Sequence, residues 1–218
     1  MSSPPSLTKH EEDDIIVANS VEQKYRVRKQ SLYSIYYTWD LANYMVKYGD
    51  DVRQEHFAMQ MIYEFNSIFQ SKKLKLKLTP YEIIPIGPEA CLVEMVQDSI
   101  SMDRLKKNLM KKYQRKVSLF EFFGVYFRGE KRLKNARRNF CYSLAAYSLL
   151  CYFLQLKDRH NGNILLHRDG RIVHIDFGFL FTTSPGGSLE KNVPFKLTSE
   201  YVAVMGDKAK SFVIEFKK

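Results

Sequence analysis

The chain has 218 residues, 45% of them apolar, which is enough for one sizeable domain or for two small lobes that share a cleft. Its 34 Lys and Arg against 24 Asp and Glu give a net charge of +10, which favours anionic partners such as nucleotide phosphates, nucleic acid or an acidic membrane leaflet. This is the composition of a globular protein.

Cysteine and hydropathy patterns narrow the class further. The three cysteines, Cys91, Cys141 and Cys151, are odd in number and set in apolar runs, which argues against a disulfide framework or a zinc site and favours a reducing, cytosolic setting. The longest apolar run, residues 144–156, is too short to span a bilayer, and no signal peptide opens the chain. We therefore expect any membrane contact to be peripheral.

The N-terminal half of the chain predicts a tail, several strands and one helix. Residues 1–30 open with Ser, Pro and the acidic run EEDD and predict a mobile tail. Residues 31–47 are rich in aromatic and β-branched residues with turn-prone residues in the middle, which predicts a strand pair. Apolar side chains at helical spacing predict an amphipathic helix over residues 53–70. Three further strands are predicted over residues 73–78, where KLKLKL alternates strictly, 81–87 and 90–96, the last of them central.

The C-terminal half predicts mainly helices around one hairpin. A basic helix is expected to follow a Ser101 cap, and residues 133–156 predict a buried core helix. Asp169 and Gly170 stand between the apolar runs NILLH and RIVHI, which is a strong hairpin signal. The remaining predictions are a short helix over 117–127, a loop at 182–188 and a capped helix in 197–206.

The stretch from Leu156 to Gly178, LKDRHNGNILLHRDGRIVHIDFG, concentrates polar side chains in the turns between apolar runs. Burying a carboxylate without a partner is costly, so these groups need compensation, and a metal ion is one candidate. Asn163 and Asp176 stand at the two ends of the predicted hairpin and supply the oxygen ligands that Mg²⁺ prefers. His160 is the only side chain of this loop that acts as a base near neutral pH.

Each part of this stretch has a simpler explanation when taken alone. The aspartate of DFG is typical of a turn, DRH of a surface ion pair and Asn163 of a turn cap, while His174 on a strand is expected to be structural. The combination D-x-H-x-x-N, hairpin and D-F-G within twenty-one residues directly after a buried helix instead favours metal-assisted phosphoryl transfer.

Together these motifs resemble one family. KDRHNGNILL followed by HIDFGF resembles the catalytic and metal-binding loops of phosphatidylinositol 3- and 4-kinases, and KDRHNGN resembles the type III phosphatidylinositol 4-kinases. VKYGDDVRQE, PYEIIPIG, CLVEMV and SPGGSLEKNVPFKLTSEYVAVMG extend the resemblance, in order, over residues 31–207. FKLT is similar to the beta type, whereas AAYSLL and SPGG are similar to the alpha type, and we prefer the beta type.

The resemblance implies an α+β, two-lobed protein-kinase-like fold with an antiparallel-sheet N-lobe. Its N-lobe and hinge would occupy residues 31–96, after the tail at 1–30. A mostly helical C-lobe would follow over 97–218, with the catalytic loop at 157–163 and the activation loop at 176–197. Relatives continue with several more helices, so we expect this C-lobe to be incomplete.

The resemblance also implies how the N-lobe would bind ATP. Lys47 would contact the nucleotide phosphates and Glu55 would pair with Lys47 across the turn from strand to helix. Val93 resembles the gatekeeper, and Glu94 and Val96 resemble the hinge residues whose backbone groups meet adenine. Ser34, in the phosphate-covering turn SLYS, stands where many relatives have glycine, and serine makes close backbone approach to the phosphates more restricted.

In the C-lobe the resemblance implies the metal ligands and the proton acceptor. Asn163 and Asp176 would hold Mg²⁺, or Mn²⁺ in its place. His160 would take the proton from the inositol hydroxyl with Asp158 in support. The spacing of Asp158 and Asn163 matches that of the catalytic Asp and Asn of protein kinases, so Asp158 is an alternative base. Arg159 is expected to hold the loop by ion pairing.

The resemblance implies phosphatidylinositol as substrate. The activation loop contains only Lys191 and Lys196 as cations, without the basic cluster that suits a phosphorylated headgroup, which favours plain phosphatidylinositol. Choice of the 4-hydroxyl rests on the resemblance. The expected setting is peripheral, at the Golgi or another endomembrane, with recruiting adaptor proteins or small GTPases as further partners and no nucleic acid.

Other functions stay open at this point. A related phosphatidylinositol 3-kinase or a protein Ser/Thr kinase would use the same motifs, and a truncated C-lobe would leave a non-catalytic interaction module. The basic stretches KKNLMKK and RGEKRLKNARR suit an acidic leaflet, although such stretches are more often solvated helix faces.

Overall fold

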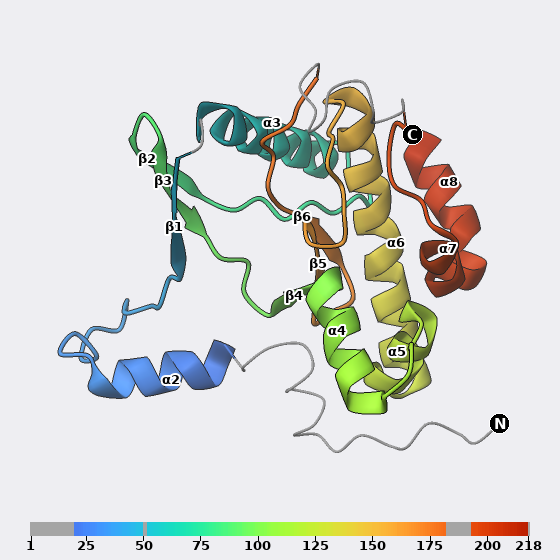
Figure 1. Cartoon of the computed structure of the whole chain (residues 1–218), viewed down its shortest axis with the longest axis horizontal. Coiled ribbons are helices and arrows are strands. Elements are labelled where there is room, and N and C mark those ends of the chain that lie inside the picture. Colours follow the sequence, from blue (N-terminus) through green and yellow to red (C-terminus); the bar gives the residue numbers. More distant parts are fainter. Residues whose placement is uncertain (1–19, 50–51, 182–192, 218) are drawn as a thin grey trace.

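Two small antiparallel sheets organise the chain, one in each lobe (Figure 1). The structure is a computed structural model that describes residues 20–49, 52–181 and 193–217. In the first sheet the strand order is β1-β3-β2, and in the second it is β4-β5-β6. The first sheet consists of β1 (Tyr44–Tyr48), β2 (Ile83–Gly87) and β3 (Ala90–Glu94), and the second of β4 (Ser99–Ser101), β5 (Ile164–His167) and β6 (Ile172–His174).

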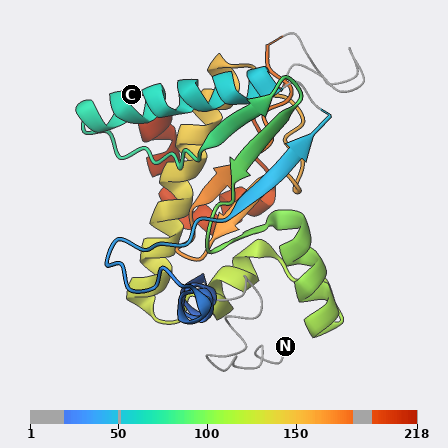
Figure 2. The same cartoon turned by 90° about the vertical axis from the view of Figure 1, so that its left-hand side faces the viewer.

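The N-lobe pairs the first sheet with a long helix, α3 (Val52–Ser71), which runs along it in Figure 2. The apolar positions of α3 repeat at helical spacing, and Ala58, Met59 and Ile62 are buried. β3 is central, as predicted, because β1 and β2 pair with its two edges. The fold class expected from the sequence, α+β with an antiparallel-sheet N-lobe and a helical C-lobe, is confirmed.

The C-lobe contains the predicted helices. Ser101 is the N-cap of α4. Its hydroxyl accepts a hydrogen bond of 3.2 Å from the Arg104 amide, which satisfies a backbone donor of the first turn. Thr198 caps the helix after the activation loop in the same way. The bounds are Met102–Tyr113 for α4, Leu119–Tyr126 for α5, Glu130–Phe153 for α6, Ser199–Met205 for α7 and Ala209–Lys217 for α8, with a short 3₁₀ turn at Gly206–Lys208.

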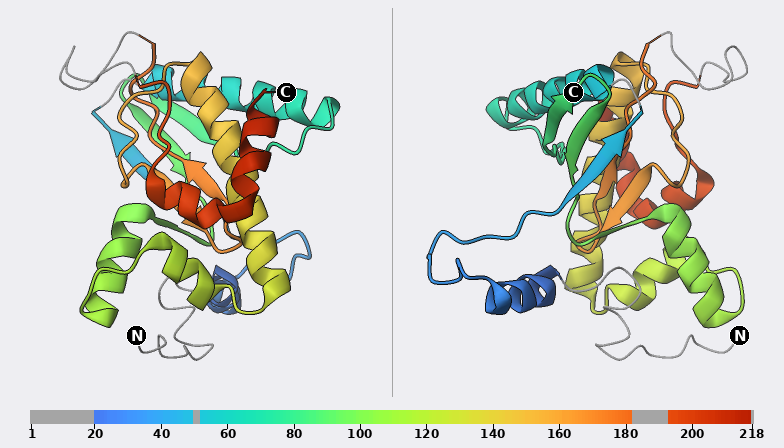
Figure 3. Two further views of the ribbon diagram at one scale, coloured as in Figure 1. Left: turned by 90° about the vertical axis from the view of Figure 1, so that its right-hand side faces the viewer. Right: turned by 60° about the vertical axis from the view of Figure 1, so that its left-hand side comes forward.

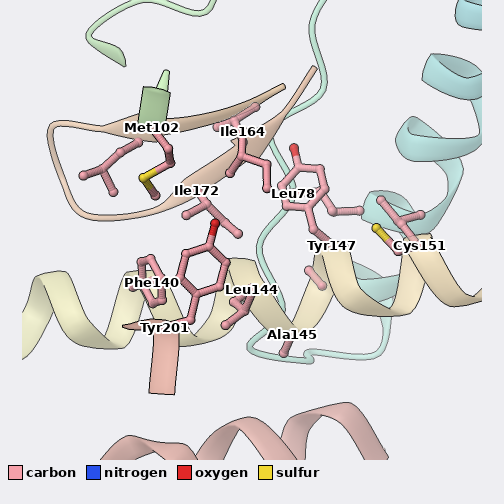
Figure 4. Close-up of a cluster of buried hydrophobic side chains, with 14 of the residues drawn as sticks. Leu78, Met102, Phe140, Leu144, Ala145, Tyr147, Cys151, Ile164, Ile172 and Tyr201 are labelled. Atoms are coloured by element: carbon pink, nitrogen blue, oxygen red, sulfur yellow. The ribbon is translucent and has the colours of Figure 1, made fainter. Parts of the chain in front are cut away.

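The core of this lobe surrounds α6, the helix predicted to be buried. Figure 4 shows side chains from α6, the second sheet and α7 converging there, among them Leu144, Tyr147, Ile172 and Tyr201. α7 and α8 both pack against α6 (Figure 3). The three cysteines are buried and unbonded to one another.

The hairpin of β5 and β6 is pressed against α6 at its turn. Gly170 has φ of +92°, and a Cβ atom there would lie 2.7 Å from the carbonyl oxygen of Ala136, so glycine is required for conformation and for space. The Ile172 amide donates to Ser143 Oγ at 2.9 Å. The hairpin is therefore held in place by contacts with a buried helix.

Two predictions for the N-terminal region are wrong. Residues 20–30, assigned to the tail, form helix α2 (Ser20–Gln30), which has Glu22 in its first turn and basic residues in its last, as the helix dipole favours. Residues 1–19 lie outside the described residues. The strand pair expected over 31–47 is a series of turns followed by β1 alone, because the amides of Ser34 and Tyr36 donate to carbonyls three residues earlier and close turns instead of a ladder.

The alternating KLKLKL stretch is half-exposed as predicted but is not a strand. Leu76 and Leu78 are buried and the neighbouring lysines are exposed. Its backbone meets a helix instead of another strand, since the Lys77 amide points to the Tyr142 carbonyl at 3.4 Å. Strand β4 and helix α8 had no sequence prediction, and the loop predicted at 182–188 lies outside the described residues.

Candidate active site

A cavity of about 590 Å³ lies between the two lobes. Its wall combines β1 and the end of β3 from the N-lobe with α4 and the hairpin from the C-lobe. Its residues are Met45, Val46, Lys47, Glu55, Tyr81, Val93, Glu94, Met95, Val96, Ser99, Ile100, Ser101, Arg104, Asn108, Asn163, Leu165, Ile175 and Asp176. Most of the predicted site residues therefore meet at one apolar cavity with a few polar groups, which is the usual form of a small-molecule site.

Lys47 lies between two carboxylates on different elements. Its Nζ is 3.0 Å from Glu55 Oε2 at the start of α3 and 3.4 Å from Asp176 Oδ1 beyond β6. Glu55 is 4% exposed, and burying its charge requires the partner that Lys47 supplies. The pairing predicted across the strand-to-helix turn is present, and the ammonium faces the cavity where a phosphate group would be attracted.

Asn163 and Asp176 face the same cavity from the two ends of the hairpin. Asp176 has φ of +60°, and its side chain is 48% exposed. Asn163 is buried, and its Nδ2 donates to the Asp158 carbonyl at 3.1 Å and to Asp158 Oδ2 at 3.3 Å. The amide nitrogen is thus committed to the catalytic loop, and the amide oxygen is the atom available to a cation.

This donor set fits Mg²⁺. One carboxylate and one amide oxygen beside a phosphate-sized space are what a nucleotide-bound Mg²⁺ needs, because phosphates and water complete its octahedron. Among residues 20–49, 52–181 and 193–217, no group of three or more His, Cys, Asp or Glu side chains forms a metal site. The donors at the cavity are thus the Asp176 carboxylate and the Asn163 amide oxygen, and phosphates and water would complete the coordination of a cation there.

Asp158 and His160 contact Asn163 but are not among the residues that line the cavity. His160 Nε2 is 3.7 Å from Asp158 Oδ2, and the Gly162 amide donates to His160 Nδ1 at 2.9 Å. In the neutral ring this bond leaves the proton on Nε2, so His160 accepts a further proton only after the bond from Gly162 breaks or the ring turns. Both residues predicted as proton acceptor thus contact Asn163, Asp158 through its carboxylate and His160 through its backbone carbonyl.

The residues predicted to form the hinge line the cavity, and part of their backbone is hydrogen-bonded within the first sheet and its flanking turns. The Glu94 amide donates to the Glu82 carbonyl at 2.8 Å, and the Met95 amide donates to Asn43 at 2.8 Å. The Val96 carbonyl accepts a hydrogen bond of 2.6 Å from Ser99 Oγ. Val93 is 8% exposed with its side chain at the cavity wall.

Three other predicted residues have different outcomes. Ser34 is absent from the cavity wall, because it lies in the turns next to α2, and its carbonyl accepts a hydrogen bond from Arg28. Figure 1 shows this segment away from the hairpin. Lys196 does not reach out toward solvent: its Nζ donates to the Arg159 carbonyl at 3.1 Å and to Asn161 Oδ1 at 2.8 Å. Lys191 lies outside the described residues.

Arg159 was expected to form an ion pair, and its side chain instead donates to backbone carbonyls. These belong to Lys157, Ile175 and Asp176. Burial lowers the pKa of Arg159, while Cys151 and the carboxylates of Asp176 and Asp158 oppose that shift.

Several residues line the cavity without having been predicted from the sequence. Tyr81, Arg104 and Asn108 line the cavity but were not predicted as site residues. Leu165 and Ile175 are partly buried hairpin residues that line the cavity, and the alternation of apolar residues along the hairpin was the available signal. Tyr81 was concealed within a strand prediction, although its ring stacks on Phe177 with centroids 6.5 Å apart.

A cavity between a three-stranded antiparallel lobe and a helical lobe, with a Lys–Glu pair on one side and an Asn–Asp pair on the other, defines a kinase-like nucleotide site. Residues 42–214 match the model of the family "Phosphatidylinositol 3- and 4-kinase". The chain belongs to this family.

Curated relatives agree with the beta-type resemblance. The chain is 44% identical over 195 residues to phosphatidylinositol 4-kinase beta 2 of Arabidopsis thaliana, covering 89% of this chain and 17% of that protein. It is 39% identical over 210 residues to phosphatidylinositol 4-kinase beta of Xenopus tropicalis, covering 94% and 25%. It is 41% identical over 187 residues to a phosphatidylinositol 4-kinase of Dictyostelium discoideum, covering 85% of this chain and 16% of that protein.

The chain thus spans a quarter or less of the length of these relatives. Among the described helices, none combines the length and the apolar character that a membrane span needs.

Proposed function

We propose that this chain is the catalytic core of an ATP-dependent phosphatidylinositol 4-kinase that converts phosphatidylinositol to phosphatidylinositol 4-phosphate. The observation that carries the proposal is the meeting of Lys47, Glu55, Asn163 and Asp176 at one interlobe cavity. These residues come from four separate parts of the chain, and a shared polar site of this composition suits a metal-bound nucleotide. The names of the relatives support the lipid substrate and the 4-hydroxyl.

Each residue would have a defined task in this reaction. Lys47, oriented by Glu55, would bind the nucleotide phosphates, and the backbone at Glu94 and Val96 would meet adenine beside Val93. Because the Glu94 amide is used in the sheet, its carbonyl is the group left for adenine at that residue. Asn163 and Asp176 would hold Mg²⁺, or Mn²⁺, which neutralises phosphate charge when bound.

Proton acceptance is proposed for His160 with Asp158. The imidazole is 59% exposed and can reach an acceptor hydroxyl once it gives up the bond from Gly162. Asp158 holds Asn163 by its carboxylate and its carbonyl, so its loss would disturb the metal ligand as well as the proton acceptor. Lys191 and Lys196 are proposed to act on the substrate side, with Lys196 bracing the catalytic loop.

The proposal includes the organisation and setting expected from the sequence. The N-lobe and hinge would occupy residues 31–96 and the C-lobe 97–218, with the catalytic loop at 157–163 and the activation loop at 176–197. Work at the cytoplasmic surface of the Golgi or another endomembrane would follow from a lipid substrate, and adaptor proteins or small GTPases would bring the kinase there. The net charge of +10 suits an acidic leaflet.

One assay tests the proposal against its alternatives. The full chain is incubated with labelled ATP and Mg²⁺ in the presence of phosphatidylinositol vesicles or, separately, of a Ser/Thr peptide mixture. Label in phosphatidylinositol 4-phosphate is the expected product. Label at the 3-position or on peptide would replace the proposed substrate. Nucleotide binding without any transfer would make the chain a non-catalytic module, and Asp176→Ala shows whether any transfer uses this site.

A further inference from the structure

Arg159 occupies the space between the catalytic loop and the loop that carries Asp176. Its Nε donates to the Lys157 carbonyl at 2.7 Å, and its Nη1 donates to the Ile175 carbonyl at 2.8 Å. Its Nη2 donates to the carbonyl of Asp176 itself. One planar side chain thus connects backbone groups at both ends of the hairpin, with a separate nitrogen for each carbonyl.

The two loops need such a connection because their conformations are unfavourable. Asp158 and Asp176 have φ of +57° and +60°, in the left-handed region that residues other than glycine rarely adopt. Such a residue persists only where surrounding contacts hold it. At Asp176 the bond from Arg159 to the residue's own carbonyl is such a contact.

Contacts on both sides hold Arg159 in turn. Its guanidinium carbon lies 5.4 Å from the ring centroid of Phe177, which is fully buried. Its backbone carbonyl accepts the hydrogen bond from Lys196 described above. Phe177, the residue after Asp176, therefore contacts the guanidinium, and Lys196, near the end of the activation loop, holds the backbone of Arg159.

We propose that Arg159 is a positioning residue that holds Asp176 in register with Asn163, so that the two side chains bind the metal of a metal–nucleotide complex together. The proposal rests on the proposed function of this site and adds to it a residue that does not touch the cavity. Residues behind metal ligands often change metal affinity about 10- to 100-fold. A lysine would keep the charge but could not reach three carbonyls.

A purely structural role for Arg159 makes a different prediction. If the side chain only stabilises the C-lobe, its removal would lower the unfolding temperature and leave the folded fraction with normal metal dependence. If it positions Asp176, removal would weaken specifically the part of nucleotide binding that depends on Mg²⁺. Nucleotide contacts made by Lys47 and the hinge would remain.

The experiment compares ADP binding in EDTA with ADP binding in excess MgCl₂ for the full chain and for Arg159→Met, Arg159→Lys and Arg137→Met. Arg137 is the matched control, because its guanidinium also lies over a ring, at 5.1 Å from the centroid of Phe120, but away from the cavity. The measured ratio is the dissociation constant in EDTA divided by that in MgCl₂. It should fall by about tenfold in Arg159→Met, because Mg²⁺ then strengthens ADP binding less. Arg159→Lys should lie between, and Arg137→Met should match the wild type.

Backbone hydrogen exchange supplies a second measurement that needs no ligand. The Lys157 amide donates to Phe179 and the Ile175 amide donates to Asn163, each at 3.1 Å. Both amides should exchange faster in the Arg159 variants and at the wild-type rate in Arg137→Met. Arg159→Lys serves both measurements if Arg159→Met does not fold.

The outcomes separate this inference from the proposed function. In a folded Arg159 variant, an unchanged ratio of dissociation constants overturns the positioning role, and this includes equal losses of ADP affinity with and without Mg²⁺. Unchanged hydrogen exchange at the Lys157 and Ile175 amides overturns it too. A wild-type chain that binds ADP no better with Mg²⁺ overturns the proposed function and the inference with it. Lipid phosphorylation by the wild type with a normal ratio in Arg159→Met overturns the inference alone.

Discussion

Helix α6 with the hairpin packed on it and the N-terminal segment 20–43 both contain apolar side chains, but they bury them to very different extents. On α6, Phe140, Leu144 and Leu150 are at most 2% exposed, and they support the hairpin that carries Asn163 and Asp176. In segment 20–43, Leu32 and Tyr37 are 89% and 94% exposed. The site residues of the C-lobe are mounted on the buried region, whereas Ser34, in the exposed one, is absent from the cavity.

This contrast shows what fixes a functional side chain. Left-handed conformations at Asp158 and Asp176 persist because the buried hairpin and Arg159 surround them with contacts. The turns at 31–38 have local hydrogen bonds and a contact between Arg28 and Trp39, but little buried surface. A residue there is held only as firmly as those local bonds allow.

The largest expected effect is on the rate of phosphoryl transfer, from a substitution at the end of the hairpin that should leave stability nearly unchanged. Asp176→Ala should reduce phosphoryl transfer at least about 10³-fold, because the ligand proposed for the metal next to the reacting phosphate is lost. Stability should change little, since the side chain is 48% exposed. Transfer rates and urea unfolding of the variant are compared with those of Asp103→Ala, which removes a carboxylate paired to Lys107 on α4. Near-normal turnover in Asp176→Ala would exclude the metal role.

The next effect tests the comparison through stability. Leu150→Ala should lower the free energy of unfolding by about 2–5 kcal/mol, because it leaves a cavity beside a fully buried position. Leu32→Ala makes the same change in the exposed segment and should cost less than about 0.5 kcal/mol. Urea denaturation at constant pH measures both. Equal losses would mean that segment 20–43 packs against the body of the protein in solution.

The smallest effect is acid-dependent. The Ser118 amide, followed by Arg115 and the Ser118 hydroxyl, lowers the pKa of Glu121 by hydrogen bonding to its carboxylate in a capping box. A lowered pKa in the folded state means stability that is present above pH 4.5 and lost as the pH falls through the folded pKa. Glu121→Gln should therefore reduce stability by at most about 1 kcal/mol at pH 7 and flatten its loss below pH 4.5.

Asp40 provides the control for this acid effect. The hydrogen bond from Lys24, followed by that from the Leu41 amide, lowers the pKa of Asp40 in the same direction. The carboxylate is exposed and belongs to segment 20–43, so Asp40→Asn should leave global unfolding unchanged from pH 7 to pH 4. An acid transition that shifts more in Asp40→Asn than in Glu121→Gln would contradict the comparison.

Elements defined by local chemistry were predictable. The hairpin turn at Gly170 and the caps at Ser101 and Thr198 each depend on contacts within a few residues, and all three are present. The shared placement of Asn163 and Asp176 also followed, because a short hairpin necessarily brings its ends together. These features need no knowledge of the rest of the chain.

Elements that depend on a distant partner were not predictable in the same way. Alternation in KLKLKL correctly indicates a half-buried extended stretch but does not reveal that its partner is α6 instead of a strand. Aromatic residues at 31–37 predicted a strand pair, yet no other part of the described chain covers them as a sheet face would. The carbonyl partners of Arg159 lie as far as 17 residues away, whereas the DRH motif by itself suggested an ion pair.

By itself the sequence determined the helix caps, the hairpin, the central apolar strand and the set of residue types suited to phosphoryl transfer. Such properties follow from side-chain chemistry and from periodicity over a few residues. Only the tertiary structure decided that Lys47 contacts Asp176, 129 residues later in the chain. It also decided that Ser34 lies outside the cavity wall and that Arg159 binds backbone carbonyls instead of carboxylates. Contacts of that range exist only after the two lobes have packed, because packing sets which groups lose water and which keep it.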